Sequence, residues 1–495
     1  MKHIKEQFIR YMDAGFPIIY LDTYEEDKAD DLIRSVAGGR KIEEWNVRGY
    51  FENQVLMQAE APLEDILRTL IDDPLSLQRS VLVLKDVPLF KDQMAVIELL
   101  KYLARRIGNG SLPDFNIVIV SSEVYIPGEL DPFLTILHDE YLTVSDIRGV
   151  IEQFCHDQEV DMLPEFIREL SQMFKGLSEY EINTILALAL SDDGEITRSD
   201  LSLILEQKKQ VVQKSGILEM IPLKEGMGDI GGLESLKQWL QRKEKIFRNM
   251  EAAAAFGVDM PKGVLIAGMP GCGKSLNAKA AAKLFGVPLL RLDMGRLMGK
   301  YVGESEANMR KAIGLAEAIA PCVLWIDELE KAFAGVGGSG GAADVTTRLF
   351  GTFLTWLQEK DSQAFVVATA NNIANMPPEL LRKGRFDEIF YVALPNKEER
   401  KKIFSIHIGK RRPDDLEGID LDRLAARTDG YSGADIEGVV KDSIEAAFAK
   451  GEDAITTDGI LEAVSQTHSL KEIMKDSLQK MESLYKQRKF KNASA

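Results

Sequence analysis

The stretch GVLIAGMPGCGKSLNAKAAAKLFG, residues 263–286, carries the strongest structural signal in the chain. Its first six residues are apolar or small and predict a buried strand, and the residues after the turn follow helical spacing. Between strand and helix, GMPGCGKS at 268–275 fits the pattern G-x-x-x-x-G-K-S/T. Glycines let such a turn curl so that successive N–H groups point inward and bind an anion, and the following helix adds its positive end. The stretch therefore predicts a phosphate-binding loop on an α/β sheet.

The side chains of this loop allow a more specific prediction. Lys274 is expected to reach the β- and γ-phosphates of a nucleoside triphosphate, and Ser275 to offer its hydroxyl to Mg²⁺. A chance match is the alternative, and the strand before the loop and the helix after it disfavour that alternative. The residues expected to bind the nucleotide here are Pro270, Gly271, Cys272, Gly273, Lys274, Ser275 and Leu276.

Two adjacent acids end a second apolar run, VLWIDE at 323–328. Desolvating two carboxylates at the end of a buried strand costs several kcal/mol unless a cation or hydrogen-bond donors are present. We therefore expect Asp327 to bind Mg²⁺ through water or Ser275, and Glu328 to orient and activate the attacking water. A solvated strand end is the alternative explanation.

Apolar runs on both sides of these motifs extend the α/β pattern. Helical patterns separate the runs, which implies a parallel sheet with right-handed crossovers, and after Pro395 the chain is helical nearly to its end. The strands of this sheet are expected at 263–268, 288–293, 322–327, 364–370 and 388–394.

The first 200 residues repeat the order of a parallel sheet followed by helices. Apolar runs at 17–23, 80–87 and 115–122 predict strands buried on both faces, and helical periodicity takes over from about 145 to 215. The loop after the first strand, YEEDKADD, lacks the glycines and the lysine of a phosphate loop and carries five acids that would repel a nucleotide. We therefore expect a domain without nucleotide chemistry in this half.

The composition bears on partners and compartment. The chain of 495 residues has 61 basic and 78 acidic residues, a net charge of −17, which argues against nucleic acid because its binders show basic stripes. The basic segment at 480–495 is expected to be a frayed, solvated helix end. Three scattered cysteines fit a reducing, cytoplasmic compartment or an equivalent organelle interior. No signal peptide and no run of about 18 apolar residues is found, so we expect no membrane contact.

From about residue 226 to 450 the chain resembles the AAA clade of P-loop ATPases, which are ring-forming protein remodellers. The whole chain is similar to a narrower group, the AAA proteins encoded in cyanobacterial and some algal plastid genomes, which carry an N-terminal α/β region before one AAA module. The segments that carry the resemblance are GDIGGLESLK (228–237), KYVGESEANMR (300–310), ATANN (368–372), LLRKGRFD (380–387), SIHIGK (405–410) and GYSGADI (430–436).

The resemblance implies further contacts for the nucleotide. The backbone near Asp229 and Gly231 is expected to lie against adenine, and His407, Gly433 and Ala434 are expected near adenine and ribose. These five residues would complete the site that the phosphate loop begins.

The resemblance also implies residues that act on the γ-phosphate. Asn371 is expected beside the γ-phosphate and the attacking water. Arg382 and Arg385 are expected to reach the nucleotide of a neighbouring copy, since a guanidinium supplied in trans stabilises the charge of phosphoryl transfer. The alternative for the arginines is an ion pair with Asp387 or Glu388 in the same chain.

Tyr301 and Val302 resemble the first loop that grips a polypeptide in the central channel of a ring. The alternative is a buried tyrosine at a helix junction. The glycine-rich stretch GVGGSGGAA at 335–343 is a candidate for the second such loop.

Two positions depart from the family pattern. Ala370 stands between Thr369 and Asn371, where the family has Thr-Asn adjacent, and Glu330 stands where the family often has Asp. Neither change is expected to prevent hydrolysis. In the first half, Asp86 ends a strand as a magnesium-binding aspartate would, but valine and proline follow it where a catalytic glutamate belongs. That half is therefore expected to be a degenerate AAA-like domain, with an unrelated α/β adaptor as the alternative.

We therefore expect an α/β fold in four parts. These are a degenerate AAA-like N-terminal domain at 1–205, a linker at 206–225, an AAA large domain at 226–395, and a helical lid with a tail at 396–495. The expected function is Mg²⁺-dependent ATP hydrolysis at the subunit interfaces of a homo-oligomeric ring, a hexamer by family resemblance, used to remodel or unfold a protein client. The alternatives are an ATP-dependent assembly switch or scaffold without threading, and a nucleic-acid motor.

Overall fold

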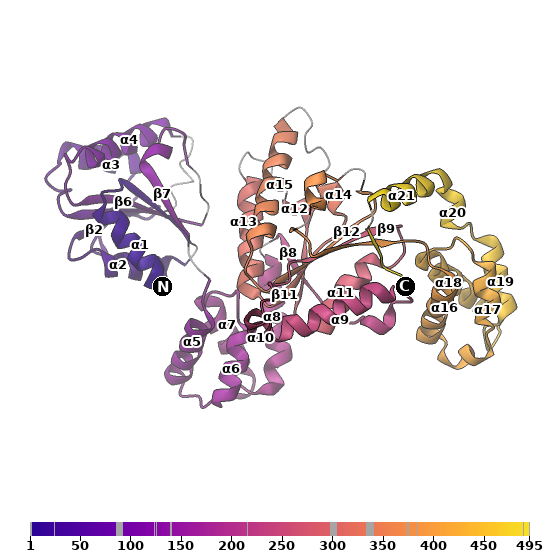
Figure 1. Ribbon diagram of the computed structural model, residues 1–495. Coiled ribbons are helices and arrows are strands. Elements are labelled where there is room, and N and C mark those ends of the chain that lie inside the picture. The colour runs from indigo at the N-terminus through magenta and orange to yellow at the C-terminus, as the bar shows by residue number, and fades with distance from the viewer. Residues whose placement is uncertain are drawn as a thin grey trace. The chain divides into compact units, whose positions relative to one another are not determined.

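The chain folds into two compact units, Met1–Tyr141 and Leu142–Ala495 (Figure 1). Each unit is built around its own seven-stranded sheet. The computed structural model describes residues 2–494 except 24, 86–92, 123, 125, 139–140, 215, 298–303, 333–340, 374–375, 383 and 489.

The sheet of the first unit is covered by helices on both faces. Successive residues of one strand point to opposite faces, so Ile18 and Tyr20 pack with α3 and α4, whereas Ile19 and Leu21 pack with α1 and α2. This double coverage explains why the central strands read as unbroken apolar runs. The strands, in sheet order, are β4 (Val55–Ala59), β3 (Gly49–Glu52), β2 (Lys41–Asn46), β5 (Ser80–Lys85), β6 (Phe115–Ser121), β1 (Ile18–Asp22) and β7 (Leu134–His138). The helices are α1 (Lys2–Asp13), α2 (Glu26–Val36), α3 (Leu63–Asp72) and α4 (Met94–Gly108).

The sheet of the second unit follows the same plan. Leu265 and Ala267 pack on the face covered by α13 and α15, and Val264 and Ile266 pack on the face covered by α9 and α11. The strands, in sheet order, are β14 (Lys491–Asn492), β13 (Glu388–Val392), β9 (Gly263–Gly268), β12 (Ala364–Ala370), β11 (Cys322–Ile326), β10 (Leu289–Leu292) and β8 (Leu218–Ile221). The helices around it are α9 (Glu234–Arg248), α10 (Met250–Ala255), α11 (Lys274–Phe285), α12 (Met294–Leu297), α13 (Glu304–Ile319), α14 (Leu329–Ala332) and α15 (Gly341–Glu359).

The two sheets share one order of parallel strands. In the first unit, five parallel strands run β7-β1-β6-β5-β2, and in the second they run β13-β9-β12-β11-β10. Both series begin with the last parallel strand along the chain, continue with the first, and then run backwards through the other three. Each strand of one sheet therefore has a counterpart at the same place in the other. The expectation of two α/β units with parallel sheets is confirmed, and the strand order gives the two units a common architecture.

A helical bundle begins the second unit, whereas the sequence predicts it as the end of the first domain. Lys175 donates a hydrogen bond to the carbonyl of Ala320, just after α13. Gly176 lies so close to α13 that an added Cβ would approach Ile319 Cγ1 to 2.5 Å. These contacts explain why the bundle belongs with the second sheet rather than with residues 1–141. Its helices are α5 (Val144–Asp157), α6 (Pro164–Met173), α7 (Glu179–Asp193) and α8 (Leu201–Lys214).

The segment expected as a linker, 206–225, contains regular structure. Helix α8 continues to Lys214, and it buries Ile204, Lys208 and Val212 at intervals of four residues, along one face. Strand β8 then pairs antiparallel with β10 at the edge of the sheet. The end of α8 agrees with the helical periodicity expected to about 215, whereas β8 was not expected because a four-residue strand gives little periodicity.

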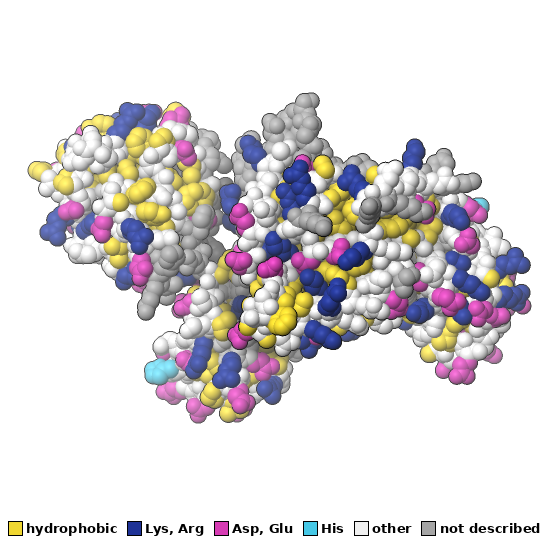
Figure 2. All heavy atoms as spheres, in the orientation of Figure 1, with side chains coloured by type: hydrophobic (Ala, Val, Ile, Leu, Met, Phe, Trp, Pro, Cys, Tyr) yellow, Lys and Arg dark blue, Asp and Glu magenta, His cyan; other side chains and the backbone are white. Residues whose placement is uncertain are grey.

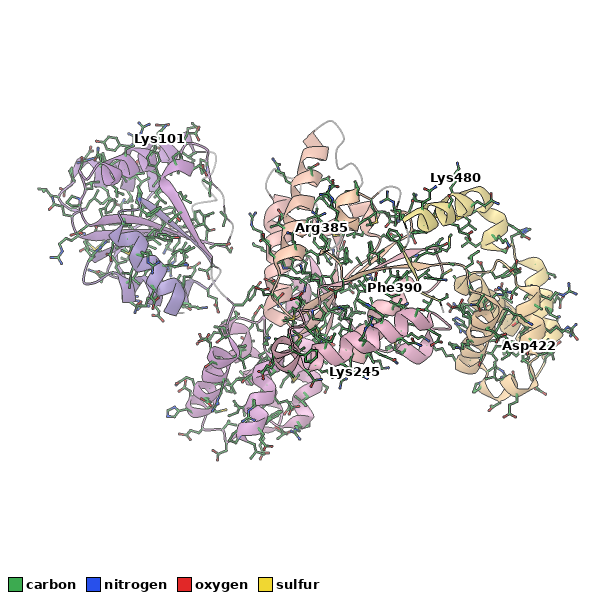
Figure 3. The ribbon with its side chains drawn as sticks, in the orientation of Figure 1. Lys101, Lys245, Arg385, Phe390, Asp422 and Lys480 are labelled. Carbon is green, nitrogen blue, oxygen red and sulfur yellow. The ribbon has the colours of Figure 1, made fainter. Side chains whose placement is uncertain are left out.

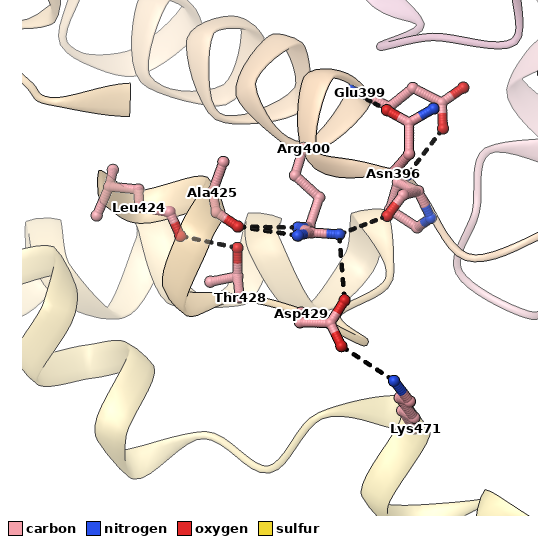
Figure 4. Close-up of polar contacts among 9 residues, drawn as sticks. Asn396, Glu399, Arg400, Leu424, Ala425, Thr428, Asp429 and Lys471 are labelled. Carbon is pink, nitrogen blue, oxygen red and sulfur yellow. Dashed lines mark hydrogen bonds and ion pairs between the residues drawn. The ribbon is translucent and has the colours of Figure 1, made fainter. Parts of the chain in front are cut away.

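The helices that follow β13 form a lid that has its own apolar core. Asn396 caps α16, and Arg400 in its first turns is buried (Figure 4). The Arg400 guanidinium donates to the carbonyls of Ala425 at 2.9 Å and Pro395 at 2.8 Å. It thereby joins α16 to α17. The lid helices are α16 (Lys397–Arg411), α17 (Leu421–Arg427), α18 (Gly433–Lys450) and α19 (Thr457–Gln466), and α20 (Leu470–Ile473) and α21 (Lys475–Arg488) follow.

The basic segment at 480–495 is not the frayed, solvated helix end that the sequence predicts. Tyr485 is 2% exposed, and β14 adds an edge strand beside β13. Backbone hydrogen bonds join Ala493 to Tyr391 at 2.8 Å and to Leu236 at 3.1 Å. The prediction failed because these contacts involve backbone groups and two tyrosines rather than an apolar run.

The described surface is mixed in charge. Figure 2 shows Lys and Arg side chains interspersed with Asp and Glu over the visible face of both units. Among the described residues, no helix is both long and apolar enough to span a bilayer.

Candidate active site

The phosphate loop lies between β9 and α11, as the sequence predicts. Three of its glycines have positive φ, with Gly268 at 150°, Gly271 at 70° and Gly273 at 81°. A Cβ on Gly268 would lie 2.1 Å from the carbonyl oxygen of Val392 in β13, so only glycine fits there. Gly273 directly precedes α11, whose first N–H groups have no partner within the helix. The turn therefore presents the donors that a phosphate group requires.

Lys274 is held inside this turn. Its side chain is buried, and its ammonium donates to the carbonyls of Gly268 at 3.1 Å and Met269 at 2.6 Å. Burial lowers the pKa of Lys274. An anion beside this ammonium would offset that cost, which is the chemistry expected of a triphosphate site.

The loop and the acid pair meet across the sheet. Ser275 Oγ donates to Asp327 Oδ1 at 3.1 Å, although the two residues are 52 positions apart. A hydroxyl and a carboxylate are oxygen ligands of the kind that Mg²⁺ prefers. The predicted metal pair is thus brought together at the end of β11.

Thr369 connects the two acids. Its side chain is buried, and its hydroxyl donates to Asp327 Oδ1 and accepts the backbone N–H of Glu328 at 3.1 Å. Glu328 has φ of 50°, a left-handed conformation that is uncommon outside glycine and is found in strained functional sites. Sequence reasoning gave Thr369 no role.

Asn371 reaches the same group of side chains. Its Nδ2 donates to Glu328 Oε1 at 3.1 Å, and its backbone N–H donates to Glu330 Oε1 at 2.9 Å. Lys331 contacts the other oxygen of Glu328 at 2.7 Å from an exposed position. The alternation of strand residues explains the convergence, because Thr369 and Asn371 are two apart at the end of β12 and share a face. Glu330 is a further residue whose contact sequence reasoning missed.

The lid contacts the phosphate loop directly. The N–H of Ala434 donates to the carbonyl of Gly271 at 3.0 Å. A Cβ on Gly433 would lie 3.1 Å from the same carbonyl, and one on Gly271 would meet Ser432 Oγ at 2.9 Å. Two expected lid residues therefore lie against the turn. Ser432, which caps α18, was not predicted to take part.

Helix α16 brings together the other residues expected near adenine. Gly231 packs on Ile403, since an added Cβ would lie 2.5 Å from Ile403 Cγ1. Asp229 forms an ion pair with Lys410 at 2.7 Å, and the N–H of Gly226 and Lys410 lower the pKa of Asp229. The side chain of Asp229 is thus used by the protein, and its backbone N–H donates to the carbonyl of Gly226 at 3.0 Å.

His407 supplies an unused polar atom beside these residues. Its Nδ1 is buried and has no hydrogen-bond partner among the described residues, and burial lowers the pKa of the imidazole. A neutral ring nitrogen of this kind can pair with the polar edge of a purine base. The residues present therefore fit a nucleotide.

Two other loop residues have packing roles. Burial raises the pKa of Cys272 to about 11, so it is a neutral thiol, and its Sγ lies 3.6 Å from the carbonyl of Pro270. Leu276 packs against the apolar cluster on the α9 side of the sheet.

The two predicted arginine fingers have no ion pair with the described residues. Arg382 is exposed, and Arg385 is half-buried with its Nη1 buried and without a partner in the described part of the chain (Figure 3). Asp387 instead pairs with Lys243 at 2.9 Å, and Glu388 pairs with Lys491. Among the described residues, neither arginine therefore forms the alternative ion pair with Asp387 or Glu388.

The predicted channel loops fall largely outside the described residues. Tyr301 and Val302 lie in the gap at 298–303, and most of the glycine-rich stretch lies in the gap at 333–340. Its last residues, 341–343, belong to the first turn of α15.

The corresponding end of the first sheet is filled by the protein's own charges. Lys85, at the end of β5, is buried and contacts Asp30 at 3.0 Å, Glu44 at 3.1 Å and Glu26 at 3.7 Å. Burial alone would lower the pKa of Lys85, but Asp30 and Glu44 raise it above its ordinary value. Asp86, expected to imitate a metal ligand, lies outside the described residues. In this unit an ion-pair cluster therefore joins the end of β5, the strand that corresponds to β11, to α2 and β2.

Comparison with known proteins agrees with this architecture. Residues 264–394 match the family described as ATPase family associated with various cellular activities (AAA), and residues 418–462 match the AAA+ lid domain. Residues 4–138 and 145–215 match the N-terminal and second domains of SpoVK-like AAA ATPases.

Two relatives match almost from end to end. "Uncharacterized AAA domain-containing protein ycf46" of Guillardia theta is 38% identical over 467 residues, covering 92% of this chain and 90% of the relative. The protein of the same name in Pyropia yezoensis is 34% identical and covers 98% of both chains. "Cell division cycle protein 48 homolog" of Archaeoglobus fulgidus is 35% identical over 253 residues, covering 50% of this chain and 34% of that protein. With its SpoVK-like N-terminal domains, phosphate loop, acid pair and lid in this order, the chain belongs to the AAA family of ATPases.

Proposed function

We propose that this ATPase uses Mg²⁺ to hydrolyse ATP at the interfaces between its own copies in a ring, and that the cycle remodels protein partners. The observation that carries the proposal is the connected set of side chains beside the phosphate loop. Ser275, Asp327, Thr369, Glu328 and Asn371 are joined by successive hydrogen bonds. Such a set can position a metal, a water molecule and the γ-phosphate together.

Each residue has a role that follows from its contacts. Lys274 and the N–H groups of the turn bind the β- and γ-phosphates, and the lid residues around His407 bind the base. Mg²⁺ held by Ser275 and Asp327 would neutralise charge on the β- and γ-phosphate oxygens. Glu328 orients the attacking water and accepts its proton. Asn371 holds the Glu328 carboxylate through its Nδ2, and its proposed place is beside the γ-phosphate.

The two arginines support the proposal of a ring. Arg382 and Arg385 lie after η6 (Pro378–Leu381) and have no ion pair with the described residues. A guanidinium that pairs with none of the described residues is available to the nucleotide of the next copy, where such a contact is worth about 10³-fold or more in rate. We propose Arg382 as the main finger, with Arg385 beside it, and six copies in the ring by family expectation.

The proposed client is a polypeptide gripped by Tyr301 and Val302 in the central channel. An aromatic ring grips by shape and apolar contact, which suits clients of varied sequence. The net charge of −17 makes a nucleic-acid client a poor match. The three cysteines are free thiols, which supports a reducing compartment such as the cytoplasm or an equivalent organelle interior.

The test of hydrolysis uses two variants of the full chain. Lys274→Ala should lose ATP binding, because the buried ammonium that faces the phosphates is gone. Glu328→Gln should bind ATP normally and lose turnover by about 100-fold or more, because its amide cannot accept the proton. Phosphate release and fluorescent-nucleotide binding measure the two effects. Wild-type turnover in either variant would contradict the assigned site.

The same Glu328→Gln protein tests the ring and the client. With ATP it should accumulate as a closed oligomer in mass photometry, with any client trapped. Tyr301→Ala should assemble and hydrolyse ATP but lose stimulation by a protein client. If Tyr301→Ala is fully functional, the chain is an ATP-dependent assembly switch rather than a threading machine, and salt-sensitive binding of DNA or RNA would point to a nucleic-acid motor.

A further inference from the structure

The segment that carries the two proposed arginine fingers is bound to the sheet by a lysine. Lys262 immediately precedes β9, and its ammonium donates to the carbonyl of Gly384 at 2.8 Å. Gly384 lies between Arg382 and Arg385 in the chain. The contact joins residues 122 positions apart, so no local sequence pattern marks it.

The same lysine holds the segment at a second point. The backbone N–H of Lys262 donates to Asp387 Oδ2 at 3.1 Å, and the N–H of Asp387 donates to the carbonyl of Gly263 at 2.9 Å. Lys243 on α9 also contacts Asp387 Oδ2, at 2.9 Å. Since Asp387 follows Arg385 by two residues, the chain is held after this arginine as well as before it.

Regular structure fixes Lys262 in turn. Its carbonyl accepts the N–H of Val366 in β12 at 3.0 Å, and β9 then continues to Gly268 at the phosphate loop. Its ammonium also donates at 2.5 Å to the carbonyl of Gln358, near the end of α15. The last carbonyls of a helix have no partner within it, and a cation is favourable there. Lys262 is therefore held by two strands and a helix end.

The turn at Gly384 requires glycine for its conformation rather than for space. Its φ is 95°, and a Cβ added there would meet no atom of the described residues within 4 Å. The carbonyl of Gly384 and the N–H of Arg385 belong to one planar peptide group. The Lys262 ammonium on that carbonyl therefore fixes the backbone from which the Arg385 side chain starts.

We propose that Lys262 is a positioning residue for the arginine fingers, and that it acts on the ATP site of the neighbouring copy rather than on its own. The inference rests on the proposed roles of Arg382 and Arg385. Lys262 holds the peptide group before Arg385, and together with Lys243 it holds Asp387 after it. Because β9 begins beside Lys262 and ends at the phosphate loop, one strand supports both the site of a copy and the arginines that it offers to the next copy.

A purely structural role for Lys262 makes a different prediction. If Lys262 only caps α15 and supports β9, Lys262→Met should impair the copy that carries the change. A positioning role predicts slow hydrolysis in the neighbour of the changed copy, with ATP binding intact. The two roles therefore separate according to which copy loses activity.

The first measurements are steady-state ATP hydrolysis and nucleotide affinity of the full chain. Lys262→Met keeps most of the aliphatic stem and removes the ammonium donor. Its kcat should fall by about tenfold, as small losses of alignment do, and its affinity for a fluorescent ATP analogue should stay within about twofold of wild type. The matched control is Lys491→Met, which removes an ion pair with Glu388, the residue after Asp387. That control should keep wild-type kcat.

Mixed rings identify the copy that Lys262 serves. Glu328→Gln cannot hydrolyse ATP but offers intact arginines, and in an equimolar mixture about a quarter of the interfaces place a Lys262→Met site beside these arginines. If Lys262 acts on the neighbour, such interfaces work normally and the mixture shows about a quarter of wild-type turnover. If Lys262 acts within its own copy, every Lys262→Met site stays slow and turnover is about a twentieth of wild type.

Wild-type kcat in Lys262→Met, or only the lower turnover in the mixture, would overturn the inference. Should Lys262→Met not fold, Gly384→Ala makes the same test from the other partner, because its methyl group has room but strains the turn. Its kcat should fall and recover on mixing in the same way, and a loss without recovery would equally overturn the inference. Failure of the proposed function looks different, since Arg382→Ala would then hydrolyse ATP at the wild-type rate.

Discussion

Glu328 shows at the scale of one residue how the site is assembled. Its φ of 50° is uncommon for a non-glycine residue, and the conformation persists because two neighbours hold it. Thr369 accepts its backbone N–H at 3.1 Å, and Asn371 donates to its carboxylate at 3.1 Å. The backbone contact and the side-chain contact come from the same strand end, so the orientation of Glu328 depends on β12 as much as on its own strand.

Thr369→Val tests this dependence. Valine keeps the volume of threonine but leaves the Glu328 N–H without its acceptor and removes one of the two hydroxyls that donate to Asp327. The loss of one such buried hydrogen bond costs about 1–3 kcal/mol, so kcat should fall by about tenfold or more. Thr369→Ser is the control, because it restores the hydroxyl and should recover most of the activity. Equal phosphate-release rates in the two variants would mean that the hydroxyl has no part in orienting Glu328.

The residues of the site divide into those that sequence can identify and those that it cannot. The loop and the acid pair are contiguous motifs with a chemical meaning of their own, so they could be read directly. The hydrogen bonds of Thr369 and Glu330 join residues 41 and 42 positions apart, and nothing local marks them. A partial signal existed for Thr369, because it lies two residues before Asn371 and a strand places such residues on one face.

At the scale of elements, apolar runs predict structure well and paired charges conceal it. The run at 263–268 is strand β9, and the run at 364–370 is strand β12, with the bounds that the sequence predicts. Strand β2 was missed because KIEEWN contains acids, yet Glu43 is fully buried against Lys41 at 3.1 Å. Strand β14 was missed because it has two residues and pairs through its backbone. Such elements depend on partners far away in the sequence.

Helix α8 offers a pH-dependent test of a concealed charge. Burial lowers the pKa of Lys208 from 10.5 to about 8, and its ammonium donates to the carbonyl of Met173 at the end of α6. Between these two values the unfolded chain keeps the proton and the folded chain releases it. The contribution of Lys208 to stability therefore rises with pH through this window.

Lys208→Met removes that titration. As pH rises from about 7.5 to 9.5, the melting temperature of wild type should gain about 2 °C or more relative to the variant, measured by scanning calorimetry. Lys209→Met, at the half-exposed neighbouring position, serves as the control and should show no comparable trend. If the difference in melting temperature between wild type and Lys208→Met stays constant with pH, Lys208 has the same pKa in the folded and the unfolded chain.

At the scale of the whole molecule, two sheets with the same strand order carry different side chains at their ends. The first unit fills the end of its sheet with the Lys85 ion pairs, and the second unit carries the phosphate loop. The described part of each copy thus contains one phosphate loop, and Arg382 and Arg385 form no ion pair within that part. That each unit contains a parallel sheet was predictable from the repeated pattern of apolar runs, but the order of the strands was not. The sharing of a site between copies is expected from the family resemblance and stays a proposal, because it depends on a second molecule.

Mixing two inactive variants tests that sharing. Arg382→Ala keeps an intact Glu328 but has no finger to offer, and Glu328→Gln keeps Arg382 but cannot hydrolyse ATP. If the finger acts in trans, an Arg382→Ala subunit regains activity when its neighbour is a Glu328→Gln subunit. In a random equimolar ring about a quarter of the interfaces have this arrangement, so the mixture should recover about a quarter of wild-type turnover. A finger that acts within its own chain gives no recovery at any mixing ratio. Arg382→Ala mixed with a subunit that carries both changes is the control, because no interface in that mixture combines a working glutamate with a neighbouring arginine.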